Sequence, residues 1–332
     1  MFYSMARNPL YGAIRNGVRK LFVKSLAVCM PPAFLLDNRH FDVWQERGYH
    51  ITSADYYSPI PNTQELSDEI FQKKSELVGI DINEPGQLTL IDTFMHHYRE
   101  EYSQIPDTKT DIPHQYYFMN VTFGPVDGEI LYCMVRHLKP RQIYEIGSGN
   151  STHLSAQALL ENKKRDGVSG KLFAVEPFPE TLPILRVGFP GLTRLIEKKA
   201  QDIPLSAYEQ LQENDILFID SSHVAKIGSD VQYLYLEVLP RLKKGVLVHS
   251  HDVFIPAEYP PEVVKDHHFF WNEQYLLQAL LTFNDRFEVL WGSYYMHLTH
   301  PDKLRVAFSS YDAYCNKHTT LLPASFWIRK IK

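Results

Sequence analysis

Short apolar runs separated by helical segments predict a parallel sheet in the last two thirds of the chain. Seven such runs indicate buried strands, at residues 142–146, 171–175, 193–197, 216–219, 245–249, 287–291 and 305–309. The segments between them predict helices at residues 152–164, 181–187, 229–242 and 272–283. Strands that alternate with helices are typical of an α/β fold whose mainly parallel sheet is covered on both faces.

The first third of the chain lacks this alternation. Apolar residues at three- and four-residue steps predict a helix over residues 10–26, and two more helices are expected at 65–78 and 88–102. We therefore expect an N-terminal helical extension or cap over residues 1–115. The sheet domain should occupy residues 116–332.

The N-terminal helix has an unusual charge. Residues 1–36 contain five basic residues (Arg7, Arg15, Arg19, Lys20 and Lys24) and no acidic one. A basic helix with one apolar face can lie on an anionic membrane surface. It can equally pack on its own domain or on another subunit of a homo-oligomer, which is the commoner use of such a face. The sequence leaves both interpretations open.

Composition excludes several classes of protein. The chain has 34 Lys and Arg against 39 Asp and Glu, and a net charge of −5 disfavours a protein that tracks nucleic acid. Cys29, Cys133 and Cys315 are scattered without metal-ligand spacing, which favours a reducing compartment. The apolar stretch 21–36 contains Lys24 and two prolines, so it predicts neither a membrane span nor a signal peptide. We expect a cytoplasmic protein.

A glycine-rich turn follows the first predicted strand. It reads Glu-Ile-Gly-Ser-Gly-Asn-Ser-Thr from Glu145 to Thr152, so Gly147 and Gly149 let the backbone approach a ligand and Ser151 suits a helix start. Ligands of parallel sheets bind at this carboxyl end of the strands. A dinucleotide fold would need a third small residue where Thr152 stands, and Glu145 would repel a phosphate.

Two further acidic residues follow the next strands. Glu176 ends the strand at 171–175, where a carboxylate can accept hydrogen bonds from a ribose diol. Asp202 follows the third strand and could accept a hydrogen bond from an adenine amino group. The alternative for Asp202 is a solvated turn residue.

Together these residues resemble the class I S-adenosylmethionine-dependent methyltransferases over about residues 116–310. The resemblance implies a Rossmann-like seven-stranded sheet that ends in a reversed hairpin. It also implies that the cofactor S-adenosylmethionine contacts Glu145, Gly147, Gly149, Ser151, Glu176 and Asp202. Glu145 would lie near the methionine end, and the three acidic residues would line one common hollow.

A second group of polar residues follows the fourth and fifth strands. Asp220, His251 and Asp252 form an oxygen-and-imidazole set able to hold a divalent metal, and His223 could act as a general base beside Asp220. Ile-Asp-x-x-His after the fourth strand resembles the metal-dependent O-methyltransferases. His251 departs from that pattern, and its imidazole suits Mn, Fe or Zn better than Mg. In the alternative, these residues only cap loops.

The sequence thus predicts O-methylation of a hydroxyl on a small molecule, such as a sugar or a secondary metabolite. N-methylation without a metal is one alternative. An NAD-dependent oxidoreductase is another, although Thr152 and the lack of a Tyr-x-x-x-Lys pair argue against it. A binding module without activity is the third.

Overall fold

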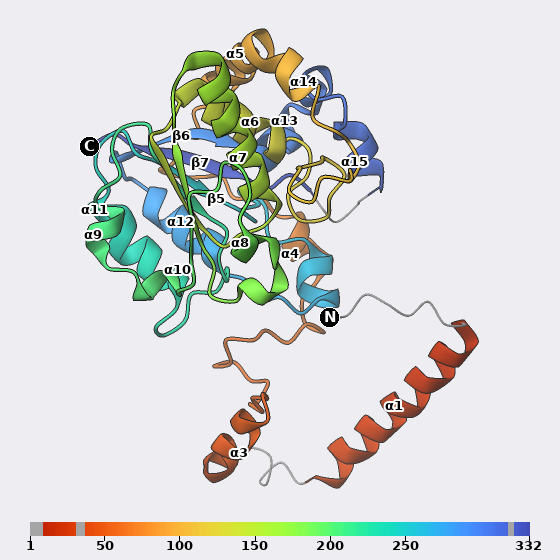
Figure 1. Ribbon diagram of the computed structural model, residues 1–332. Coiled ribbons are helices and arrows are strands. Elements are labelled where there is room, and N and C mark those ends of the chain that lie inside the picture. The colour runs from red at the N-terminus through yellow and green to blue at the C-terminus, as the bar shows by residue number, and fades with distance from the viewer. Residues whose placement is uncertain (1–8, 31–36, 318–321) are drawn as a thin grey trace. The chain divides into compact units, whose positions relative to one another are not determined.

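The computed structural model describes residues 9–30, 37–317 and 322–332 (Figure 1). The chain divides into two compact units, Met1–Leu66 and Ser67–Lys332. The sequence analysis placed a different boundary at residues 115/116, where the methyltransferase-like region is expected to begin. That boundary stays a prediction. Residues of 67–115 pack in the core of the second unit, because Ile91, Phe94 and Tyr102 are all buried there.

The first unit contains α1 (Pro9–Cys29), the short turn η1 (Asn38–His40) and α3 (Phe41–Glu46). The helix predicted at 10–26 is therefore confirmed as α1. Every side chain of this unit whose burial is described is exposed or half-exposed, including Leu21 and Phe22 of α1. Among its described residues, this unit accordingly has no hydrophobic core. None of the described helices is long and apolar enough to cross a membrane.

The second unit contains a seven-stranded sheet in the order β3-β2-β1-β4-β5-β7-β6 (Figure 1). Its strands are β1 (Gln142–Ile146), β2 (Lys171–Val175), β3 (Arg194–Ile196), β4 (Ile216–Ile219), β5 (Leu247–Ser250), β6 (Phe287–Gly292) and β7 (Phe326–Lys330). β7 runs antiparallel to both β5 and β6, and the other neighbours are parallel. The predicted α/β sheet with its reversed last hairpin is confirmed.

One predicted strand is wrong. Residues 305–309 belong largely to the helix α14 (Pro301–Ala307), in which Leu304 and Ala307 are buried one turn apart while Val306 points to solvent. The buried side chains thus follow helical spacing, although the short apolar run at residues 306–308 suggested a strand. The true partner of β6 is β7, whose Phe326, Trp327 and Ile328 are all buried.

Helices cover both faces of the sheet. On β4 the side chain of Phe218 joins one core cluster, and those of Leu217 and Ile219 join the other. The first cluster includes residues of α5 (Glu84–Tyr102), α6 (Asp127–Leu138), α7 (Asn150–Glu161), α13 (Ser293–Thr299), α14 and α15 (Tyr311–Lys317). The second includes residues of α9 (Leu205–Tyr208), α10 (Asp230–Tyr233), η5 (Leu234–Val238), α11 (Leu239–Arg241) and α12 (Glu273–Leu281).

Shorter elements complete the unit: α4 (Asp68–Gln72), η2 (Asn162–Asp166), η3 (Pro179–Thr181), α8 (Ile184–Val187), η4 (Ala200–Asp202) and η6 (Glu262–Asp266). The helix predicted at 65–78 is wrong beyond the five residues of α4. The chain becomes extended after Lys73, because Lys74 forms a β-bridge with Ala257 and the Ser75 N–H donates to the Pro256 carbonyl.

Candidate functional site

The glycine turn after β1 is held against the end of β4. Gly147 has φ +82°, and its N–H donates to the Val175 carbonyl of β2. A Cβ at this position would lie 1.8 Å from the Asp220 carbonyl oxygen, so only glycine fits. At Gly149, in contrast, a Cβ would meet open space, and the Gly149 N–H donates to Thr152 Oγ1 at 2.9 Å. The turn therefore brings the carboxyl ends of β1, β2 and β4 together.

A cavity of about 460 Å³ opens at these strand ends. Its wall comes from the turns after β1, β2 and β4, from η4 and from the start of α10. The lining includes Gly147, Glu176, Gln201, Asp220, Ser221 and Asp230. A cavity of this volume lies within the usual range for small-molecule sites. Gln201 Oε1 and Ser221 Oγ are buried polar atoms with no hydrogen-bond partner among the residues described.

Only part of the predicted cofactor set lines this cavity. Gly147 and Glu176 do, and the half-buried Glu176 also accepts the Phe178 N–H at 2.8 Å. Asp202 is exposed and is not among the lining residues. Because residues 200–202 form the tight turn η4, neighbouring side chains diverge, and Gln201 takes the place expected for Asp202. The side-chain Nε2 of Gln201 donates to the Gly228 carbonyl at 2.9 Å.

Glu145 and Ser151 lie behind the glycine turn rather than in the cavity wall. Both are buried, and Ser151 Oγ donates to Glu145 Oε1 at 2.6 Å. Burial raises the pKa of Glu145 to about 8, against the smaller opposing effect of the Ser151 hydrogen bond. The expectation that Glu145, Glu176 and Asp202 line one hollow is thus not met. Glu145 instead supports the turn from inside.

The buried Glu145 gives a pH-dependent contribution to stability. Its folded pKa lies above the ordinary value, so the folded state holds the proton more tightly and loses stability as the pH rises from about 4.5 through 8. Glu145→Gln keeps the acceptor for Ser151 and cannot ionise. We expect the variant to gain in Tm over the wild type at about pH 8.5 and to gain much less at about pH 5.5. Thermal unfolding at both pH values measures this, and an equal gain at both would contradict it.

Next to the cavity, the ends of β4 and β5 carry a cluster of carboxylates and imidazoles. His223 Nε2 lies 3.3 Å from Asp220 Oδ1 and 3.4 Å from Asp252 Oδ2. His251 Nδ1 lies 3.7 Å from an oxygen of each carboxylate, Asp220 Oδ1 and Asp252 Oδ1. The structure therefore brings together all four residues that the sequence singled out here. Asp220 also lines the cavity and links it to the cluster.

Two further carboxylates stand behind the histidines, and the sequence analysis connected neither of them with the histidines. Glu273, the first residue of α12, places Oε2 2.9 Å from His223 Nδ1. Asp127, the first residue of α6, places Oδ2 3.5 Å from His251 Nε2. Both look like ordinary acidic residues in the first turn of a helix. No sequence signal connects them to histidines so far along the chain.

Burial opposes a positive charge on the two histidines, but their carboxylate neighbours outweigh it. Asp220 and Glu273 hold the pKa of His223 well above its ordinary value. Asp252 and Asp220 do the same for the pKa of His251. Burial likewise opposes the charge of Asp220, yet His251 and His223 lower its pKa to about 2. The carboxylates of the cluster thus stabilise a positive charge. Without a bound cation, the protonated imidazole rings carry that charge.

The spacing of the cluster also suits a divalent cation. One ligand atom each of Asp220, His223 and Asp252 lies within 4.8 Å of the others. Ligand atoms about 2.0–2.2 Å from one cation lie about 3–3.6 Å apart, which matches the His223 distances. The sequence analysis grouped His251 with the two carboxylates as a metal ligand. In the structure His223 lies with these carboxylates, and both of its ring nitrogens face carboxylate oxygens.

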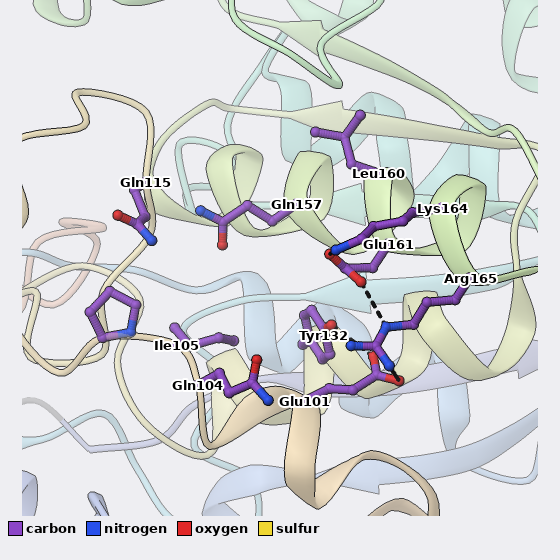
Figure 2. Close-up of a pocket in the computed structure, with 11 residues that line it drawn as sticks. Glu101, Gln104, Ile105, Gln115, Tyr132, Gln157, Leu160, Glu161, Lys164 and Arg165 are labelled. Carbon is purple, nitrogen blue, oxygen red and sulfur yellow. Dashed lines mark hydrogen bonds and ion pairs between the residues drawn. The ribbon is translucent and has the colours of Figure 1, made fainter.

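A separate hollow of about 300 Å³ lies between α5, α6 and α7 (Figure 2). Its charged side chains pair with one another, because Arg165 contacts Glu161 at 2.7 Å and Glu101 at 3.8 Å. None of the predicted site residues lines this hollow. The candidate site is therefore the cavity with its adjoining cluster.

The comparisons with known proteins agree with this geometry. Residues 144–253 match a family described as "Methyltransferase domain". That range spans β1 to the end of β5 and holds the glycine turn, Glu176 and the Asp220–Asp252 cluster. The chain belongs to the class I S-adenosylmethionine-dependent methyltransferases.

Relatives of this methyltransferase include an archaeal protein. A protein of Archaeoglobus fulgidus named only "Uncharacterized protein" is 30% identical over 180 residues, which is 52% of this chain and 78% of that one. The methyltransferase and this Archaeoglobus fulgidus protein belong to the same family.

Two solved structures are similar in part. A methyltransferase of Podospora anserina with bound S-adenosylhomocysteine is 15% identical, covering 73% of this chain and 88% of that one, with a TM-score of 0.36. An O-methyltransferase of Bacillus cereus, also with S-adenosylhomocysteine, is 16% identical, covering 74% and 91%, with a TM-score of 0.34. The assignment of this methyltransferase rests on the family match and the strand order.

Proposed function

We propose that this methyltransferase transfers a methyl group to a hydroxyl of a small-molecule acceptor, which binds at the His–carboxylate cluster. One observation carries the proposal: Asp220 is part of both the cavity wall and the cluster. A donor in the cavity and an acceptor at the cluster would therefore meet at one residue. Proximity and orientation of this kind supply on the order of 7–11 kcal/mol in favourable cases.

The cavity fits S-adenosylmethionine. Glu176 would accept hydrogen bonds from the ribose hydroxyls, and the side chain of Gln201, which also lines the cavity, would lie at the adenine. The cofactor supplies an activated methyl group on a sulfonium. The chain's own contribution is to hold the donor and to bring an acceptor oxygen into line with it.

The cluster explains why a hydroxyl is the preferred acceptor. A hydroxyl must lose its proton as it takes up the methyl group, and its pKa lies far above neutrality. Asp220 and Asp252 present carboxylate oxygens beside His223 and His251, so a divalent cation held there would stabilise the acceptor oxygen while its proton leaves to solvent and the donor's S–CH3 bond is exchanged for an O–CH3 bond. A neutral amine has a free lone pair and needs no such cluster, which disfavours N-methylation.

We propose in addition that Asp220, His223, Asp252 and His251 hold a divalent cation. The cation would lower the pKa of the acceptor hydroxyl and fix its position. Two imidazole ligands favour Mn or Fe over Mg. His223 would act as the general base only if no cation is bound at the cluster. Because its two ring nitrogens face carboxylate oxygens, the geometry favours a ligand role over that of a free base.

Calorimetric titration of the full chain tests the donor assignment. S-adenosylmethionine should bind with a micromolar Kd, and NAD should not bind. The opposite result would favour the oxidoreductase, and binding without turnover would favour a module without activity.

Release of S-adenosylhomocysteine with a panel of sugar and phenol acceptors tests the reaction. We expect turnover with a hydroxyl acceptor, loss of turnover after chelation and recovery with Mn²⁺. Turnover that survives chelation would remove the cation from the proposal, and turnover with amines alone would replace O- by N-methylation.

A further inference from the structure

The side chain of Glu273 meets the cluster from the side opposite the two aspartates. It is 1% exposed, and its Oε2 lies 2.9 Å from Nδ1 of His223. The other ring nitrogen, Nε2, faces Asp220 and Asp252 at 3.3 and 3.4 Å. The imidazole is thus held at both nitrogens. An Nδ1–H that donates to Glu273 leaves Nε2 as the nitrogen that can serve the cluster.

The backbone joins the same two segments. The carbonyl oxygen of His223 accepts the N–H groups of Asn272 and Glu273, at 3.0 and 3.2 Å. Asn272 Oδ1 in turn accepts the Ala225 N–H at 2.6 Å. The start of α12 therefore forms hydrogen bonds with the loop after β4 at His223 and at Ala225.

His223 also needs to be held, because its backbone is strained. Its φ is +58°, in the left-handed region that residues other than glycine seldom adopt. Such a conformation persists only where the surroundings enforce it. The side chain is further packed against Trp271, with ring centroids 4.8 Å apart. His223 is therefore buried and fixed at both its backbone and its side chain.

We propose that Glu273 is a positioning residue that orients the His223 imidazole, so that Nε2 faces the place between Asp220 and Asp252. This inference rests on the proposed function for its catalytic meaning, but its geometric part stands alone. Carboxylates that orient a metal-bound or basic histidine are a common device, and losing one costs about 10–100-fold in metal affinity or activity. A carboxylate that only capped a helix would not be expected to contact a buried imidazole.

The decisive comparison is between Glu273→Gln and Glu258→Gln in the full chain. Both replace a carboxylate by an amide of the same shape. Glu258 belongs to the loop before η6, where its Oε1 accepts the Tyr259 N–H at 2.8 Å and the Tyr275 hydroxyl of α12, so it touches the same helix as Glu273 but not His223. Circular dichroism and Tm establish first that both variants fold.

Two readouts separate positioning from a purely structural role. The first is NMR of protein with ¹⁵N-labelled histidine, assigned with His223→Gln: the Nδ1–H of His223 should exchange slowly in the wild type and in Glu258→Gln, and faster in Glu273→Gln, because the neutral amide oxygen accepts a weaker hydrogen bond than the carboxylate. The second is Mn²⁺ affinity without donor or acceptor, which should fall about 10–100-fold in Glu273→Gln alone.

Failure of this inference differs from failure of the proposed function. If the wild type binds no Mn²⁺ and transfers no methyl group, the proposed function fails, and the NMR comparison still judges Glu273. If folded Glu273→Gln keeps the slow Nδ1–H exchange of the wild type, the positioning role is overturned. Equal changes in Glu273→Gln and Glu258→Gln would overturn it as well, because they would point to general loosening.

Discussion

Asp220→Asn should abolish most of the methyl transfer while leaving the donor bound. Asp220 lines the cavity with its backbone in contact with the glycine turn, but its carboxylate faces His223 and His251. The amide keeps the size of the side chain and removes the charge that the cluster shares. We expect kcat to fall by about 10²–10⁴-fold, the range for losing a positioned acid–base group. The Kd for S-adenosylmethionine should change little.

Asp230→Asn is the matched control for this experiment. Asp230 lines the same cavity, but its carboxylate accepts hydrogen bonds from the Ser222 N–H and Oγ rather than from a histidine. Its effect on kcat should be at least ten times smaller than that of Asp220→Asn. Should the two variants lose activity equally, the shape of the cavity, and not the cluster, would be what matters at Asp220.

Glu176→Gln should do the reverse, weakening the donor complex without slowing transfer in the saturated enzyme. A hydrogen bond to a charged group contributes about 1.5–3 kcal/mol, which corresponds to roughly 10- to 150-fold in Kd. Glu176 is half-buried at the end of β2, with its carboxylate in the cavity wall, so a ribose is the natural partner. Calorimetry gives Kd, and initial rates at saturating donor give kcat.

Asp202→Asn provides the control and also decides between two assignments. Sequence reasoning placed Asp202 at the adenine, whereas the structure has it exposed and puts Gln201 in the cavity wall. We expect Asp202→Asn to bind the donor within twofold of the wild type. A loss as large as that of Glu176→Gln would restore Asp202 to the cofactor set and contradict the cavity described above.

Local patterns predicted most of the sheet because its strands are short, buried and close to glycine turns. The error at residues 305–309 arose because residues 306–308 form a short apolar run like those of the true strands, although α14 buries Leu304 and Ala307 one helical turn apart. The true last strand was missed although Phe326, Trp327 and Ile328 form the same kind of apolar run. Such a run can be told from a buried helix only by its neighbours in space.

The candidate site was predictable where chemistry sits directly at a strand end. Asp220, His223, His251 and Asp252 follow β4 and β5, and parallel neighbours bring their ends together. Asp127 and Glu273 begin helices, and only packing shows that they reach the histidines. Asp202 failed for a different reason. Within the tight turn η4 a shift of one residue changes which side chain faces the cavity.

The glycine turn leaves no room for a Cβ at position 147 beside the Asp220 carbonyl, so the two halves of the site meet there. A side chain at 147 would have to push the end of β4 away, and with it the residue at which donor and acceptor chemistry meet. Attempts to alter which molecules are methylated should therefore leave this junction untouched.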